Sequence, residues 1–160
     1  MSRAVISLGS NVGDRMAHLR AGVAAFGTQV RAVSSVYRTP PWGPVAQDDF
    51  YNLVLIAEDG TVDAGGWLAK CQAVEQQQER QRGVRWGPRT LDADVITVDA
   101  QISDEDPDLV LPHPRAHERA FVLVPWAELD PTATLPGYGP IADLLDGLDR
   151  SGVRKVGHVR

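Results

Sequence analysis

The sequence predicts an α+β fold, a ferredoxin-like βαββαβ sandwich with helical and strand additions at its C-terminal end. Three observations support this fold: apolar strand-like runs at 4–8, 50–57 and 91–98, two amphipathic helical stretches between them, and the order in which they alternate. That order is typical of an antiparallel sheet with helices on one face. Since 160 residues is the usual size of one domain, we expect residues 1–160 to form a single domain.

The first strand and the first helix have clear boundaries. Residues 4–8 are apolar and are followed by Gly9-Ser10-Asn11, which predicts a buried strand that enters a turn. Apolar residues then recur at positions 16, 19, 23 and 26, which places them on one helical face, and Gly27 can end that helix.

Two β-rich segments follow on either side of a proline loop. Residues 30–38 favour a strand because of their β-branched side chains, and residues 50–57 form a second long strand closed by Asp59-Gly60. Between them, three prolines within 39–44 remove backbone donors and exclude regular structure.

The remaining elements are a long helix, a strand and several short additions. We expect a helix at about 62–80 and a strand at 91–98, separated by a basic loop at 81–88. The additions are a short strand at 109–111, a mostly helical stretch at 115–129, a helix at 141–148 and a closing edge strand at 153–159.

Composition excludes several classes of protein. A net charge of −5 without any block of five or six like charges argues against a nucleic-acid partner. No apolar stretch approaches the roughly 20 residues of a membrane helix, so we expect no membrane partner. A single cysteine, Cys71, and the lack of a signal-peptide pattern favour the cytoplasm, where we expect a monomer that acts on small molecules.

Two carboxylates mark the first candidate site. Asp92 and Asp94 are two residues apart on a predicted strand, so both point to one face while Ala93 points into the core. Their repulsion is relieved by a hard cation such as Mg²⁺, which takes one or two carboxylates together with phosphate oxygens. Two unrelated aspartates on a solvated face would show the same spacing, and this reading is favoured for the pair alone.

The residues around this pair favour a phosphate site. Arg82, Arg85 and Arg89 lie within the ten residues before Asp92, as a site for a metal and a polyphosphate requires. The preceding helix carries Gln72 and Glu75 on one face, which could also be only a solvated face. The chain has neither the glycine-rich P-loop pattern nor the Rossmann pattern for holding phosphates.

Two more clusters could bind a ligand. Phe50 and Asn52 lie two apart on a strand, so a ring and an amide face the same side, as a flat hydrogen-bonding heterocycle requires. A core phenylalanine beside a turn-linked asparagine is the alternative. His113 and His117 have the spacing of a zinc pair, but Pro114 places His113 at or before the helix start, and no third ligand lies nearby.

Taken in order, these clusters resemble the 6-hydroxymethyl-7,8-dihydropterin pyrophosphokinases, and the resemblance covers nearly the whole chain. Its most specific block is Arg85-Trp86-Gly87-Pro88-Arg89-Thr90-Leu91-Asp92-Ala93-Asp94. The other matching segments are Leu8-Gly9-Ser10-Asn11, the run from Val33 to Gly43, Phe50-Tyr51-Asn52, Pro112-His113-Pro114-Arg115 and Glu118-Arg119-Ala120-Phe121. The family fold is the ferredoxin-like sandwich, and the resemblance implies a single pyrophosphokinase domain.

The resemblance implies a Mg²⁺-dependent transfer of pyrophosphate from ATP to the pterin hydroxymethyl group, releasing AMP in folate biosynthesis. Asp92 and Asp94 would hold two Mg²⁺ ions, with Arg82 and Arg89 as further catalytic residues. The implied ATP contacts are Gln72, Glu75, Arg82, Trp86, Arg89, His113 and Arg119, with Arg80 on the same loop. The implied pterin contacts are Thr39, Pro41, Trp42, Phe50, Asn52 and Phe121, with the two phenylalanines on either side of the ring.

Two departures from the family pattern and two alternatives accompany this interpretation. The loop between Arg82 and Trp86 is one residue shorter than in some members, and residues 108–111 offer no cation or hydroxyl, so no site residue is assigned there. A ferredoxin-like domain can also be a binding module without chemistry. Another phosphotransferase that uses Mg²⁺ and ATP on a different flat heterocycle is the second alternative.

Overall fold

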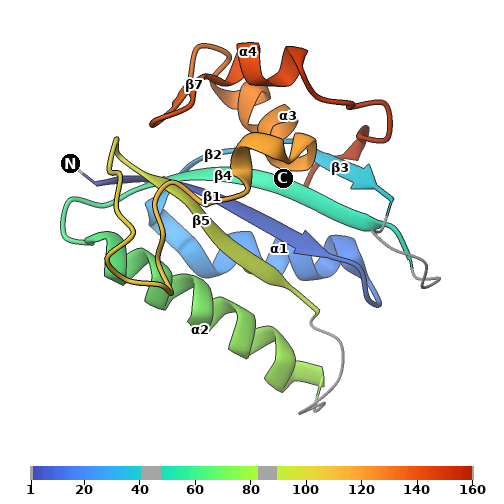
Figure 1. The fold of residues 1–160 in the computed structure, drawn as a ribbon. Helices are drawn as coiled ribbons and strands as arrows, with labels where there is room; N and C mark the ends of the chain where they lie inside the picture. Colours follow the sequence, from blue (N-terminus) through green and yellow to red (C-terminus); the bar gives the residue numbers. More distant parts are fainter. Residues whose placement is uncertain (1, 41–47, 83–89, 160) are drawn as a thin grey trace.

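A six-stranded antiparallel sheet forms the middle layer of the protein (Figure 1). The structure is a computed structural model that describes residues 2–40, 48–82 and 90–159, apart from the side chains of 79–82. The strand order is β5-β1-β4-β3-β8, and β2 also pairs with β4. The strands are β1 (Arg3–Ser10), β2 (Val30–Val33), β3 (Val36–Thr39), β4 (Phe50–Glu58), β5 (Asp92–Val98) and β8 (Arg154–Gly157).

Two long helices cover one face of the sheet. Figure 1 shows α1 (Arg15–Phe26) and α2 (Ala64–Arg82) lying side by side below it. The core between them and the sheet is built from alternate strand residues such as Leu8 and Leu55, which pack against Leu19 of α1 and Trp67 of α2. The two predicted helices and the three long strands are thus confirmed, with ends that differ by one or two residues.

The C-terminal additions form a third layer on the opposite face, where the sequence predicted helices on one face only. This layer contains α3 (Ala120–Leu129), α4 (Ile141–Asp146) and the small hairpin of β6 (Thr134–Leu135) and β7 (Gly139–Pro140) (Figure 1). Its second core joins Val54 and Ile56 of β4 to Trp126 of α3. The central strands are therefore apolar on both faces, which obscures the alternation expected of a sheet covered on one side.

Three of the predicted elements differ in the structure from the sequence prediction. The strand expected at 30–38 is divided into β2 and β3, because Ser34 binds Val54 through both its backbone N–H (2.9 Å) and its hydroxyl (2.9 Å), which interrupts the regular ladder. The strand expected at 109–111 is reduced to one bridge between Ser103 and Leu111. The helical stretch expected from 115 becomes a 3₁₀ turn, η2 (Ala116–Glu118), followed by α3, and the extended conformation of Arg119 separates the two.

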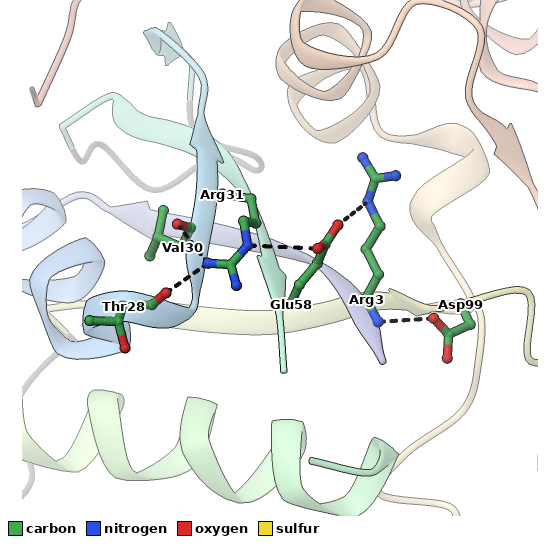
Figure 2. Close-up of polar contacts among 6 residues, drawn as sticks. All are labelled: Arg3, Thr28, Val30, Arg31, Glu58 and Asp99. Atoms are coloured by element: carbon green, nitrogen blue, oxygen red, sulfur yellow. Dashed lines mark hydrogen bonds and ion pairs between the residues drawn. The ribbon is translucent and has the colours of Figure 1, made fainter. Parts of the chain in front are cut away.

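A charged network closes the end of the sheet where β4 finishes (Figure 2). Glu58 accepts ion pairs from Arg3 (3.7 Å) and Arg31 (3.6 Å), while the backbone N–H of Arg3 donates to Asp99 (2.9 Å). Both arginine side chains are half exposed, so each pair contributes at most about 1 kcal/mol. In the described part of the chain, no helix is long and apolar enough to cross a membrane.

Candidate active site

A pocket of about 980 Å³ opens on the α3 face of the sheet, at the end opposite the charged network. Along β4, Val54 and Ile56 lie under the helical layer, whereas Phe50 and Asn52 on the same face lie in the pocket. The described residues that line it are Ser7, Gly9, Thr39, Pro40, Phe50, Asn52, Asp92, Asp94, Arg115, Glu118, Arg119, Ala120, Phe121, Asp149, Gly152 and Val153.

The two aspartates lie together on the pocket side of edge strand β5. Asp92 pairs in register with Gly9 and Asp94 with Ser7 of β1, and both carboxylates line the pocket. Ala93 between them is buried in the core under α2, as strand alternation predicts. Their partners on β1 are Gly9, which has no side chain, and Ser7, which has a small one. The space beside the two carboxylates is therefore open.

Glu75 fixes this strand from the other face. Its Oε2 accepts a hydrogen bond from the backbone N–H of Ala93 (3.1 Å), between the two aspartates. β5 is an edge strand, so a side-chain acceptor supplies a partner that no neighbouring strand provides. Gln72 is exposed on α2, and neither Gln72 nor Glu75 is among the described residues that line the pocket.

The amide of Asn52 is held in place on the central strands. Asn52 is only 4% exposed, and its Nδ2 donates to the hydroxyl of Thr39 (2.9 Å). A Cβ at Gly9 would come within 2.7 Å of Asn52 Oδ1, so the absence of a side chain at Gly9 makes room for this amide. One amide donor is used by Thr39, and the other polar groups of the amide can serve a ligand.

If the pocket binds the hydroxymethyl-dihydropterin that the resemblance implies, Asn52→Ala should weaken this binding by about 1–3 kcal/mol, because polar groups of the ligand lose a buried partner. Affinity for ATP should stay within about twofold, and the exposed amide variant Gln101→Ala should leave both ligands unaffected. Calorimetric titration of each ligand separately gives both values. Equal losses for the two ligands would assign Asn52 to folding instead.

Cations and an aromatic ring enter the pocket from the α3 layer. Arg115, Arg119 and Phe121 lie around η2 and the first turn of α3, and the guanidinium of Arg119 lies 5.5 Å from the ring centre of Phe121. Positive groups on this layer therefore face the carboxylates of β5, an arrangement that suits a ligand carrying both phosphates and metal ions.

His113 lies between these two groups of charges. Its backbone N–H donates to Ile96 of β5 (2.8 Å), and its Nδ1 accepts from the backbone N–H of Arg115 (3.2 Å). Burial lowers the pKa of His113 and the nearby arginines lower it further, although the carboxylate of Asp94 opposes them. The neutral imidazole with Nδ1 as acceptor has an Nε2–H donor to offer. Neither His113 nor His117 is among the described residues that line the pocket, and His117 stacks on Tyr138 at 4.4 Å.

A family model described as 7,8-dihydro-6-hydroxymethylpterin-pyrophosphokinase (HPPK) matches residues 5–131. The chain belongs to this family. Proteins named 2-amino-4-hydroxy-6-hydroxymethyldihydropteridine pyrophosphokinase are similar along almost their whole length. The one from Mycobacterium tuberculosis is 44% identical, over 96% of this chain and 89% of its own. The one from Methylorubrum extorquens is 45% identical, over 98% of this chain and 99% of its own.

The fold is also similar to that of solved HPPK-containing structures. The wild-type HPPK-DHPS crystal structure from Plasmodium falciparum superposes with a TM-score of 0.70 over 91% of this chain, at 13% identity. This chain spans 44% of that longer chain, and at such an identity the likeness supports the fold alone.

The aspartate pair of this HPPK-family chain fits a metal that completes its coordination with ligand oxygens. Across residues 2–40, 48–78 and 90–159, no group of three or more His, Cys, Asp or Glu side chains could hold a metal ion. Two carboxylates on one sheet face, beside cations that suit phosphates, could supply the protein ligands of a Mg²⁺ ion that also binds a nucleotide. The donors are all oxygen, which suits Mg²⁺ rather than zinc.

The pocket contains some of the predicted site residues and several that sequence reasoning missed. Thr39, Phe50, Asn52, Asp92, Asp94, Arg119 and Phe121 are brought together. Pro41, Trp42, Trp86, Arg89 and the side chains of Arg80 and Arg82 lie outside the described residues. Alternation along β1 could have identified Ser7 and Gly9 as floor residues. No local signal identified the C-terminal contributions, Asp149, Gly152 and Val153.

Proposed function

We propose that this chain transfers a pyrophosphoryl group from ATP to 6-hydroxymethyl-7,8-dihydropterin, forming AMP and the pterin diphosphate, in folate biosynthesis. Family membership supports this reaction, as does the similarity to curated pyrophosphokinases over nearly the full chain. The observation that carries the proposal is that one pocket joins an acidic pair to an aromatic and amide pair. A phosphate-metal site and a heterocycle site thus share one cavity.

The pterin end of the pocket is assigned to β3, β4 and the start of α3. Phe50 and Phe121 would lie on either side of the ring, and Asn52, held by Thr39, would bind its polar edge. Pro41 and Trp42 are assigned to the same end by resemblance. Burial of both ring faces and a fixed amide would orient the hydroxymethyl arm toward β5.

The phosphate end is assigned to β5 and to the cations opposite it. Asp92 and Asp94 would hold two Mg²⁺ ions, which would neutralise phosphate charge and lower the pKa of the substrate hydroxyl. His113 and Arg119 would bind phosphate oxygens, with Arg82 and Arg89 as further phosphate contacts and Gln72, Glu75 and Trp86 around the nucleotide. Glu75, through its bond to Ala93, would also keep the aspartates in position.

The reaction then consists of one displacement between two bound substrates. The pterin hydroxymethyl oxygen bonds to the β-phosphorus of ATP, the bond from this phosphorus to the α–β bridging oxygen breaks, and AMP leaves. The residues act by alignment and by charge complementarity, without a covalent enzyme intermediate. Arginine contacts on the outer phosphates would allow both to move as one unit.

We also infer the finer features of the fold and of the cellular setting. The strand order β5-β1-β4 followed by β2 and β3 supports a ferredoxin-like βαββαβ arrangement with C-terminal additions. We propose a single domain over residues 1–160 that acts as a monomer in the cytoplasm. Size-exclusion chromatography with light scattering would test the monomer directly.

Nucleotide analysis tests the reaction. The protein is incubated with ATP, Mg²⁺ and 6-hydroxymethyl-7,8-dihydropterin, and the nucleotides are separated. AMP in a one-to-one ratio with a pterin diphosphate is the expected result. ADP with a pterin monophosphate would indicate an ordinary kinase. Absence of any turnover that depends on this pterin would favour a binding module or a transferase for another heterocycle.

A further inference from the structure

We propose that the C-terminal turn at 149–153 forms the outer wall of the pterin end of the pocket, where Val153 contacts the pterin and Gly152 sets the position of Pro40. This inference rests on the proposed function and adds substrate-positioning residues to it. Asp149, Gly152 and Val153 all line the pocket, although they follow the last residue matched by the family model, at position 131.

The turn has a defined shape because its own hydrogen bonds close it. The carboxylate of Asp149 accepts from the backbone N–H of Ser151 (3.0 Å) and from the Ser151 hydroxyl (2.7 Å). The backbone N–H of Val153 donates to the carbonyl of Arg150 (3.1 Å). A turn closed by three such bonds can act as a wall rather than as a loose loop.

Strand pairing places Val153 next to the assigned pterin contacts. β8 pairs with β3, with Arg154 opposite Arg38 and Lys155 opposite Tyr37. Continuing this register by one residue places Val153 beside Thr39, which is itself opposite Phe50 of β4. Val153 therefore extends the row formed by Phe50 and Thr39, and its two methyl groups supply an apolar contact at the edge of the pocket.

Gly152 lies directly against the proline that follows β3. A Cβ added at Gly152 would come within 3.1 Å of Pro40 Cδ and 3.3 Å of its Cγ. Such contacts are tighter than ordinary packing, so an alanine would push the rigid proline ring or the turn itself. Since Pro40 follows Thr39 and also lines the pocket, this movement would reach the pterin end and leave the aspartates in place.

Four variants test the wall. Val153→Ala should raise the Kd for hydroxymethyl-dihydropterin about three- to tenfold through the loss of buried methyl contacts. Gly152→Ala should raise it by about fivefold or more. The controls are Val156→Ala on the adjoining strand β8, a residue that is 44% exposed, and Gly147→Ala, whose added Cβ meets only Leu144 O at 3.7 Å. Both controls should match the unmodified chain, and the Kd for ATP should stay within about twofold for all four.

The outcomes separate this inference from the proposed function. If the unmodified chain binds and converts the pterin but Val153→Ala and Gly152→Ala behave like their controls, the wall is wrong and the proposed function stands. Equal weakening of pterin and ATP would assign the turn to stability and would also overturn the wall. If the unmodified chain does not bind the pterin, both proposals fail.

Methyl NMR of the unmodified chain provides a second measurement that needs no variant to fold. The Val153 methyl signals should shift when the pterin is added, either alone or after an unreactive ATP analogue with Mg²⁺. The Val156 methyl signals should not shift. Unchanged Val153 signals at saturating pterin would overturn the contact.

Discussion

Asp92→Asn and Asp94→Asn are each expected to lower kcat by about 10²–10³-fold. Each substitution keeps the volume of the side chain but removes one anionic oxygen ligand from the pair that faces the pocket. Both side chains are half-buried at the pocket surface, outside the core, so the fold should be retained. Steady-state turnover across a Mg²⁺ titration measures the effect, and circular dichroism checks the fold.

The matched control for this pair is Asp104→Asn, an exposed carboxylate in the loop after β5. Its turnover and its dependence on Mg²⁺ should equal those of the unmodified chain. If either pocket variant kept near-normal kcat at ordinary Mg²⁺ concentrations, the assignment of the metal to this pair would be wrong. A loss fully recovered by excess Mg²⁺ would assign the residue to metal affinity alone.

Glu128→Ala is expected to destabilise the protein by about 3 kcal/mol. This carboxylate of α3 accepts from the Ser35 backbone N–H (2.9 Å), the Ser35 hydroxyl (3.2 Å) and the Tyr37 hydroxyl (2.5 Å). Ser35 and Tyr37 are both buried, so removing the carboxylate leaves the Ser35 backbone N–H and the Tyr37 hydroxyl without this acceptor, whereas the Ser35 hydroxyl still has His158 at 3.4 Å. Thermal unfolding should show a Tm lower by roughly 6–12 °C for a chain of this size.

The pH dependence of the destabilisation tests whether the ionised carboxylate of Glu128 is its cause. Burial raises the pKa of Glu128, but hydrogen bonds from Tyr37 and Ser35 outweigh it, and the net pKa is lowered. A carboxyl whose pKa is lower in the folded state stabilises the protein above its unfolded pKa. That contribution disappears as the pH falls through the folded value. The loss of unfolding free energy that Glu128→Ala causes, relative to the unmodified chain, should therefore be largest at pH 7 and become smaller below about pH 4. Glu105→Ala, in an exposed loop, should show no difference at either pH.

Local periodicity was sufficient to identify the centre of the site. The alternation of side chains along a strand places Asp92 with Asp94, and Phe50 with Asn52, without knowledge of the tertiary structure. The same rule predicts that Ala93 is buried. These predictions succeed because each depends on only a few neighbouring residues whose geometry the strand itself fixes.

The features that sequence reasoning missed depend on contacts between distant segments. Val153 enters the pocket only because β8 pairs with β3, more than a hundred residues earlier in the chain. The hydrogen bond from Ser35 to Glu128 joins α3 to the sheet, and no local pattern encodes it. The helical pattern at α2 likewise predicts a shared face for Gln72 and Glu75 but not that Glu75 binds the backbone of β5.

Gly9 of β1 lies between the strand that carries the aspartates and the strand that carries Asn52, and β1 sets the distance between these two strands. Gly9 is paired with Asp92 on one side and with Asn52 on the other, so the backbones that carry the acidic and the amide side chains lie two strand spacings apart, about 9.5 Å. Hydrogen-bonded ladders hold this interval, and rotamer changes alone cannot alter it. If Asn52 binds the heterocycle and Asp92 the metal, as proposed above, a heterocycle whose hydroxyl-bearing arm is longer or shorter by one carbon would bind the amide and still present its oxygen at the wrong distance from β5. Under that assignment, the backbone of the sheet would select the acceptor by the length of its arm.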